Sequence, residues 1–152
     1  MLVTDGNGLP IGLLVESAAP HEVKLAERTL RTVRVPRAAG GKGGRPRTRP
    51  KEVVADKAFD SRALREWLRS RGIKATIPRY ERGSKRKRPR RGRPPLPPAL
   101  TYRSRWKIER TFAWLQNHRR LEIRRERLLS TFRAFVTLAC CLILLKHFGN
   151  QF

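Results

Sequence analysis

Two segments without apolar periodicity limit the fold of this 152-residue chain more than any other feature of its sequence. They are residues 36–51, PRAAGGKGGRPRTRPK, and residues 79–98, RYERGSKRKRPRRGRPPLPP. Segments so rich in Gly, Pro and basic residues cannot bury enough apolar surface to form a core. The core must therefore come from the remaining stretches, and we expect both segments to be flexible, cationic loops.

The charge balance indicates which partner the chain meets. Thirty-six Lys and Arg residues stand against 12 Asp and Glu residues, so the formal net charge is +24. A surface this basic repels itself unless it meets a polyanion, so nucleic acid is the expected partner. Charge alone leaves two alternatives open, a highly soluble basic protein with no particular partner and a role at a membrane surface.

The first 35 residues are expected to form a hairpin followed by a helix. Residues 5–8, DGNG, are typical of a tight turn and separate an apolar strand at residues 1–4 from a second strand at residues 11–16. Pro20 suits the first turn of a helix, and apolar side chains at helical spacing follow it up to Val33.

Residues 53–77 have the pattern of a strand, a helix and a second strand. The first strand ends on Asp56, and Asp60 or Ser61 can cap the helix that follows. Gly72 supplies the left-handed residue that ends helices, and residues 73–77 return as a strand. This order predicts a parallel pair of strands with a right-handed crossover.

Two helices are expected near the C-terminus, at residues 101–118 and 130–147. The second contains the apolar stretch Ala134–Leu145, about half of the roughly 20 residues that a membrane span needs. It is therefore expected to be a core helix, and no membrane contact is expected. Cys140 and Cys141 are neighbours that point in different directions on a helix, so we interpret both as buried hydrophobes in a reducing cytoplasm.

Asp56 is the first candidate for a functional side chain. In open α/β sheets, side chains at the carboxyl ends of strands face the crevice where ligands bind. A carboxylate there can hold a divalent cation together with phosphate oxygens. Position alone also fits, and slightly favours, a plainer interpretation in which Asp56 caps a turn.

Glu109 is the second candidate, because of the residues that share its helix. Tyr102, Arg105, Glu109 and Gln116 are spaced so that all four lie along one face of a helix. The face combines an aromatic hydroxyl, a guanidinium and a carboxylate. Spacing alone does not distinguish a functional site from a solvated Arg105–Glu109 ion pair worth a few tenths of a kcal/mol.

Four stretches resemble blocks of the DDE transposases of bacterial insertion sequences: VVADKAFDS, IKATIP, YRSRWKIERTFAWLQNHRRL and RRERLLSTFRAFVTLACCLILL. In that family an A-D-K-x-[YF]-D block carries the second catalytic acid, which the resemblance places at Asp56. The third acid lies in a Y-x2-R-x3-E-x6-K signature. That signature maps onto Tyr102, Arg105 and Glu109, with Gln116 where the family normally has Lys.

The resemblance implies an α/β, RNase-H-like fold, a mixed sheet with flanking helices whose first three strands are antiparallel. Residues 1–16 would form strands two and three, and residues 53–56 and 73–77 strands four and five. Strand one, which carries the family's first catalytic Asp, is not found, and Asp5 lies in a turn. We therefore expect residues 1–152 to be the C-terminal part of a single DDE catalytic domain.

The resemblance also implies a reaction. In the family, three acids hold two Mg²⁺ or Mn²⁺ ions for phosphodiester cleavage and strand transfer at the ends of the element. Asp56 and Glu109 would be catalytic metal ligands here, supported by Tyr102, Arg105 and Gln116. With one acid missing, the chain is expected to be inactive alone and to need an upstream-encoded N-terminal part.

Double-stranded DNA, as terminal inverted repeats and target, is the implied partner. The two basic loops would neutralise its phosphates. The residues assigned to this contact are Lys42, Arg45, Arg47, Arg49, Lys85, Arg86, Lys87, Arg88, Arg90, Arg91 and Arg93. A homodimer and a place at the bacterial nucleoid, in the cytoplasm, are further expectations.

Two other interpretations remain open. A non-enzymatic, basic nucleic-acid-binding protein explains the charge equally well, although it does not explain acids on a strand end and on a polar helix face. The other is an inactive remnant of a disrupted element, and the sequence fits a remnant and an active split transposase equally well.

Overall fold

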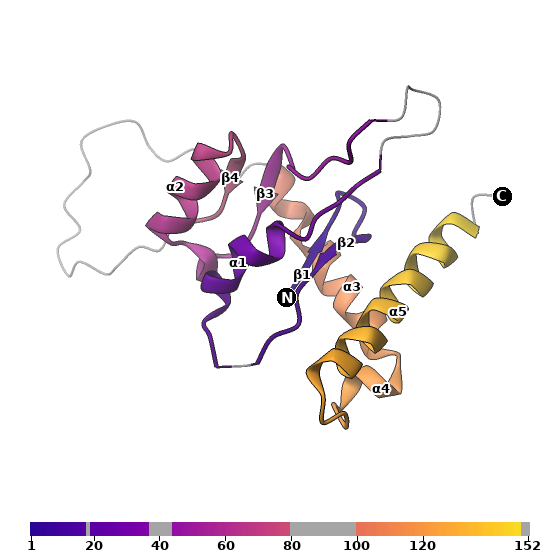
Figure 1. The fold of residues 1–152 in the computed structure, drawn as a ribbon. Helices are drawn as coiled ribbons and strands as arrows, with labels where there is room; N and C mark the ends of the chain where they lie inside the picture. Colours follow the sequence, from indigo (N-terminus) through magenta and orange to yellow (C-terminus); the bar gives the residue numbers. More distant parts are fainter. Residues whose placement is uncertain (18, 37–43, 80–99, 150–152) are drawn as a thin grey trace, which may run out of the picture.

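The computed structural model describes residues 1–17, 19–36, 44–79 and 100–149, and Figure 1 shows their arrangement. Most of the two predicted loops lies outside these residues. Within them, two small sheets pack with helices from the middle and the end of the chain.

The first sheet is the predicted hairpin. Strand β1 (Leu2–Thr4) pairs antiparallel with β2 (Pro10–Leu13). In the turn between them, one carboxylate oxygen of Asp5 accepts hydrogen bonds from the backbone N–H groups of Asn7 and Leu9, both at 2.8 Å. Gly8 has φ 87°, a conformation that favours glycine. The hairpin is confirmed, although the second strand is shorter than predicted.

Helix α1 (Glu22–Leu30) follows the hairpin and begins two residues after Pro20. Its buried side chains include Leu25, Ala26 and Leu30, as the helical spacing predicts.

The second sheet is the predicted parallel pair. Strand β3 (Glu52–Val54) pairs with β4 (Lys74–Thr76), and α2 (Arg62–Ser70) makes the crossover. Gly72 has φ 65°, and the backbone N–H of Ile73 donates to the carbonyl of Leu68 at 2.9 Å, which closes the helix end. The N-cap position falls on Ser61, whose side chain makes no capping hydrogen bond. Asp60 instead pairs with Arg65 at 2.7 Å.

The predicted helix at residues 101–118 has two parts. Residues Leu100–Arg105 form a 3-10 helix, η2, and the α-helix α3 covers Trp106–Gln116. The prediction of one continuous α-helix is therefore wrong for residues 101–105, although Arg105 still lies beside both Tyr102 and Glu109, as the spacing predicts. Short 3-10 segments of this kind are frequent at the N-termini of α-helices. A short helix, α4 (Arg119–Glu122), comes next.

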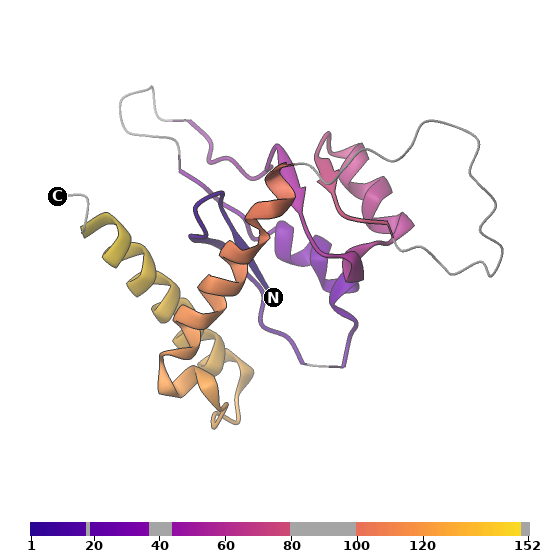
Figure 2. The same cartoon turned by 180° about the vertical axis from the view of Figure 1, so that it is seen from behind.

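The core has two clusters of buried side chains. The crossover cluster joins α1, α2 and the residues around β4, and it consists of Ala26, Leu30, Leu64, Leu68, Ile73 and Ile77. The hairpin cluster joins the end of the hairpin turn, α3 and the last helix, and it consists of Leu9, Leu115, Val136, Ala139, Cys140 and Ile143. In both views α3 runs from the neighbourhood of β3 down to α4 (Figures 1 and 2).

The last helix, α5 (Leu129–Gly149), buries one face in the core and exposes the other. Val136, Ala139, Cys140 and Ile143 are buried, whereas Leu138, Leu142, Leu145 and Phe148 are exposed. The prediction of a core helix is therefore right for one face and wrong for the other. Cys141 is likewise exposed, because neighbours on a helix point in different directions.

Among the described residues, α5 alone has the length and the apolar composition to cross a membrane, with a mean hydropathy of 1.7 and 17% of its most apolar window buried. One such helix is weak evidence for a span.

Candidate active site

Asp56 lies two residues after Val54, the last residue of β3, so the strand ends earlier than predicted. Asp56 is the N-cap residue of η1, a 3-10 helix of residues Lys57–Phe59. Its Oδ1 accepts a hydrogen bond from the backbone N–H of Ala58 at 2.9 Å. The plainer interpretation, a turn cap, is thus correct for this oxygen. The other carboxylate oxygen, Oδ2, points to a different partner.

That partner is Arg105, at the junction of η2 and α3. Its Nη1 lies 3.4 Å from Asp56 Oδ2, and its Nη2 lies 3.1 Å from Glu109 Oε1. The guanidinium also lies over the ring of Tyr102, 5.9 Å from the ring centroid. One cation thus joins the two acids that the sequence singled out, from a strand end and from the first turn of a helix.

The exposure of these groups differs. The side chains of Asp56 and Glu109 are 43% and 64% exposed, whereas that of Arg105 is 33% exposed. The acids are therefore open to a ligand from solvent, and the guanidinium lies deeper. Gln116, the remaining signature residue, is exposed at the last position of α3, about two helical turns beyond Glu109.

Three other residues of α3 fix it to the hairpin turn. Lys107 Nζ, Arg110 Nη2 and Thr111 Oγ1 donate hydrogen bonds to the carbonyl oxygens of Gly6, Asn7 and Gly8, respectively. Three successive carbonyls of one turn thus receive donors from a single helix. The sequence analysis missed these contacts, and no local pattern predicts a pairing across so long a separation.

The guanidinium of Arg110 also lies near two aromatic rings. It lies 4.9 Å from the ring centroid of Trp106 and 4.6 Å from that of Trp114. Its Nε is buried, and within the described part of the chain it has no hydrogen-bond partner. Contacts with two aromatic rings hold the end of this long side chain in place, which supports its hydrogen bond to the carbonyl of Asn7.

Metal-ligand chemistry at this site is limited to the two carboxylates. No group of three or more His, Cys, Asp or Glu side chains that could hold a metal ion occurs in the ranges that the structure describes. Asp56 and Glu109 thus offer oxygen ligands of the kind that Mg²⁺ and Mn²⁺ prefer.

The residues predicted to bind DNA are only partly described. Arg45, Arg47 and Arg49 are exposed. The backbone of Arg47 exchanges two hydrogen bonds with Val35, and Arg49 Nη1 donates to the carbonyl of Arg71 at 3.0 Å. The others lie outside the described residues: Lys42, Lys85, Arg86, Lys87, Arg88, Arg90, Arg91 and Arg93.

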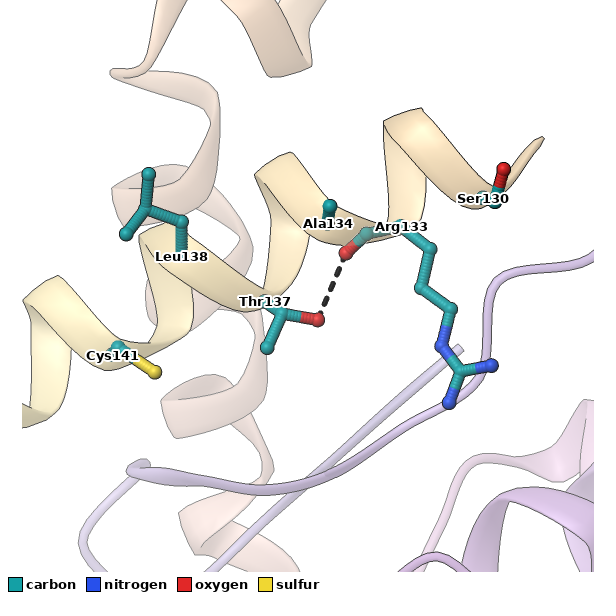
Figure 3. A pocket seen from close by; sticks show the side chains of 6 residues that line it. All are labelled: Ser130, Arg133, Ala134, Thr137, Leu138 and Cys141. Carbon is teal, nitrogen blue, oxygen red and sulfur yellow. Dashed lines mark hydrogen bonds between the residues drawn. The ribbon is translucent and has the colours of Figure 1, made fainter. Parts of the chain in front are cut away.

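A surface hollow lies away from these acids, on the outer face of α5. Figure 3 shows its lining, which is Ser130, Arg133, Ala134, Thr137, Leu138 and Cys141. All six residues belong to one helix, and neither acid is among them. We therefore do not place the candidate metal-binding site in this hollow.

The comparisons with known proteins identify the family of the chain. The family model of the transposase DDE domain matches residues 1–144, and the chain therefore belongs to the DDE transposases. A protein of Burkholderia cepacia, named as a transposase for insertion sequence element IS402, is 36% identical over 144 residues. The match covers 93% of this chain and 60% of that relative.

A second relative, from Brucella ovis, is named as a transposase for insertion sequence element IS6501. It is 35% identical over 94 residues, which cover 62% of this chain and 67% of the relative. No solved structure matches the chain.

Proposed function

We propose that the chain contributes two of the three metal-binding acids of a DDE transposase, Asp56 and Glu109, to DNA cleavage and strand transfer at insertion-sequence ends. The observation that carries the proposal is the shared contact of both carboxylates with the guanidinium of Arg105. Acids on separate elements that converge on one cation form a place where a divalent ion can bind. The family uses divalent ions, which supports the assignment.

The roles of the individual groups follow from their contacts. Asp56 would bind the ion through Oδ2, because Ala58 N–H holds Oδ1. Glu109 would bind it from the first turn of α3. A bound Mg²⁺ or Mn²⁺ would stabilise the charge that develops on the phosphodiester oxygens. Tyr102 would hold the Arg105 guanidinium beside the acids.

We further propose that the two small sheets are parts of one RNase-H-like mixed sheet. An antiparallel pair is followed along the chain by a parallel pair, as in that fold. Met1 and Val3 from the hairpin, and Val53 and Ala55 from around β3, all pack against the crossover cluster. A further strand lying between β1 and β3 and ending in Asp would complete the sheet. Its Asp would be the third of the metal-binding acids.

DNA is the substrate that the transposase relatives imply. We propose the inverted repeats and the target as its forms, with Arg45, Arg47 and the basic residues of 85–93 neutralising phosphates. Because no third acid joins the two within the described ranges, we also propose that catalysis requires an N-terminal transposase part. We also propose that the chain forms a homodimer and that it is located in the cytoplasm, at the nucleoid.

A cleavage assay tests this function. DNA that carries an insertion-sequence end is incubated with Mn²⁺ and either the chain alone or the chain co-expressed with an N-terminal fragment whose strand ends in Asp. We expect cleavage only by the co-expressed pair. Asp56→Asn or Glu109→Gln should abolish it, and Glu122→Gln, which changes an exposed acid on α4, should leave it intact.

Other outcomes are equally informative. Binding without cleavage by the pair would favour a remnant or a non-enzymatic DNA-binding protein. Cleavage by the chain alone that is lost in Asp56→Asn would show that another residue takes the place of the first acid.

A further inference from the structure

Arg105 makes ion pairs with both candidate metal ligands through separate nitrogen atoms. Nη1 contacts Asp56 and Nη2 contacts Glu109, while the Tyr102 ring lies against the guanidinium. The oxygen atoms in these two contacts are Asp56 Oδ2 and Glu109 Oε1. A divalent ion held between the two acids would compete for the same oxygens.

We propose that Arg105 is a displaceable counter-ion, which holds Asp56 and Glu109 together until a divalent ion replaces it. This inference rests on the proposed metal-binding role of the two acids. A guanidinium stays charged at all accessible pH values, so it cannot relieve its repulsion from the ion by losing a proton. It must move away from the oxygens that the ion takes.

The strength of the contacts allows such an exchange. Partly exposed ion pairs are weak because water screens them, and the exposed Glu109 carboxylate forms an ordinary i,i+4 pair. Mg²⁺ binds to carboxylates with several waters retained, so it needs only a few of their oxygens. Once released, the planar Arg105 fork can bind a phosphate, whose oxygens match its geometry.

The neighbouring cations of α3 do not suit this role. Lys107 and Arg110 donate to the carbonyls of Gly6 and Asn7, so they fix the hairpin to the helix. Arg105 differs from them in that it contacts the acids themselves. Exchange of Arg105 for a metal ion therefore leaves the anchoring of α3 intact.

Binding of Mn²⁺, measured by electron paramagnetic resonance on the full chain without DNA, tests the inference. In Arg105→Gln the competitor is gone, so we expect Mn²⁺ to bind about two- to fivefold more tightly than in the unchanged chain, as expected for loss of two weak, partly exposed ion pairs. Arg105→Lys keeps the charge but loses the fork that contacts both acids, so its affinity should lie in between.

Arg103→Gln is the matched control, because it removes an exposed charge of the same type from the same 3-10 helix. It should leave Mn²⁺ affinity unchanged. An equal gain in Arg103→Gln would show a general charge effect and overturn the inference. The inference would also be overturned if Arg105→Gln bound Mn²⁺ no more tightly than the unchanged chain while its circular dichroism stayed the same. Removal of an arginine with a merely structural role would weaken the site.

Two further variants separate failure of the inference from failure of the proposed function. Asp56→Asn and Glu109→Gln should each weaken Mn²⁺ binding. If both bind Mn²⁺ as well as the unchanged chain does, these acids are not the metal site, and the proposed function and the inference fall together. If both weaken binding while Arg105→Gln does not tighten it, the inference alone is wrong.

Discussion

The hydroxyl of Thr111 donates a hydrogen bond to the carbonyl oxygen of Gly8, across a separation of 103 positions in the sequence. Thr111 is fully buried, and its hydroxyl also lies 2.9 Å from the carbonyl of Lys107. The contact fixes the hairpin turn against α3, the helix that carries Glu109. The position of one candidate ligand thus depends on a turn near the other end of the described chain.

Thr111→Val should lower the free energy of unfolding by about 1–3 kcal/mol, because it leaves the Gly8 carbonyl without this donor in a buried place. Valine has nearly the same shape, so packing changes little. Thr137→Val is the control, since that hydroxyl donates to the Arg133 carbonyl on the exposed face of α5 (Figure 3). It should change the value by about 0.5 kcal/mol or less. Urea denaturation measures both; equal effects would contradict the role given to Thr111.

Gly8→Ala should destabilise the same junction by about 1–3 kcal/mol, since the backbone there has a positive φ. An added Cβ would also come within 3.1 Å of Arg110 Nη2 and 3.2 Å of the Lys107 carbonyl oxygen. Gly6→Ala, in the same turn, meets nothing within 4 Å and should be nearly neutral. Thermal unfolding of the two variants distinguishes them, and a stable Gly8→Ala variant would show that the turn is not held as described.

The two adjacent cysteines should differ in reactivity. Burial raises the pKa of the Cys140 thiol to about 11, with a smaller contribution from Cys141 beside it. The thiolate is the reactive form, so at pH 8 Cys140 should resist iodoacetamide while the exposed Cys141 is modified. Peptide mass spectrometry gives the two rates. The difference should disappear in denaturant, and faster modification of Cys140 in the folded chain would mean that α5 packs by its other face.

DNA binding should depend strongly on salt. Each phosphate that the protein neutralises contributes about −0.9 to the slope of log K against log salt concentration. Deletion of residues 82–93 should therefore flatten the slope, and Arg45→Gln with Arg47→Gln should flatten it by a smaller amount. Fluorescence anisotropy with a labelled duplex measures the slope. An unchanged slope after the deletion would exclude this segment from the DNA surface.

Much of the local structure was predictable because it follows from short-range rules. The turn chemistry of residues 5–8 fixed the hairpin, and Gly72 ended α2 where a left-handed residue was needed. The parallel pair followed from the order of strand, helix and strand. The sequence singled out Asp56 and Glu109, and in the structure both contact Arg105, although their metal-binding role remains a prediction.

The missed features depend on contacts between distant segments. Helical spacing did not show that Tyr102 lies in a 3-10 helix, nor that this helix contacts β3, which is distant in the sequence. Apolar composition likewise could not separate the buried face of α5 from its exposed face, since both carry leucine, isoleucine or aromatic side chains. The carbonyl ligands of Lys107, Arg110 and Thr111 depend on a fold that brings the hairpin turn to α3.

The hairpin cluster also has a consequence for the order of events on the ribosome. Leu9 is synthesised long before Leu115 and Ile143, the residues that cover it, whereas the crossover cluster lies wholly within residues 26–77. The crossover cluster, against which Met1 and Val3 of the hairpin also pack, can therefore assemble during translation, while Leu9 stays uncovered until α3 and α5 emerge. A ribosome that stalls before Leu129 would hold a nascent chain with one finished cluster and one unfinished cluster, whose exposed apolar side chains favour aggregation.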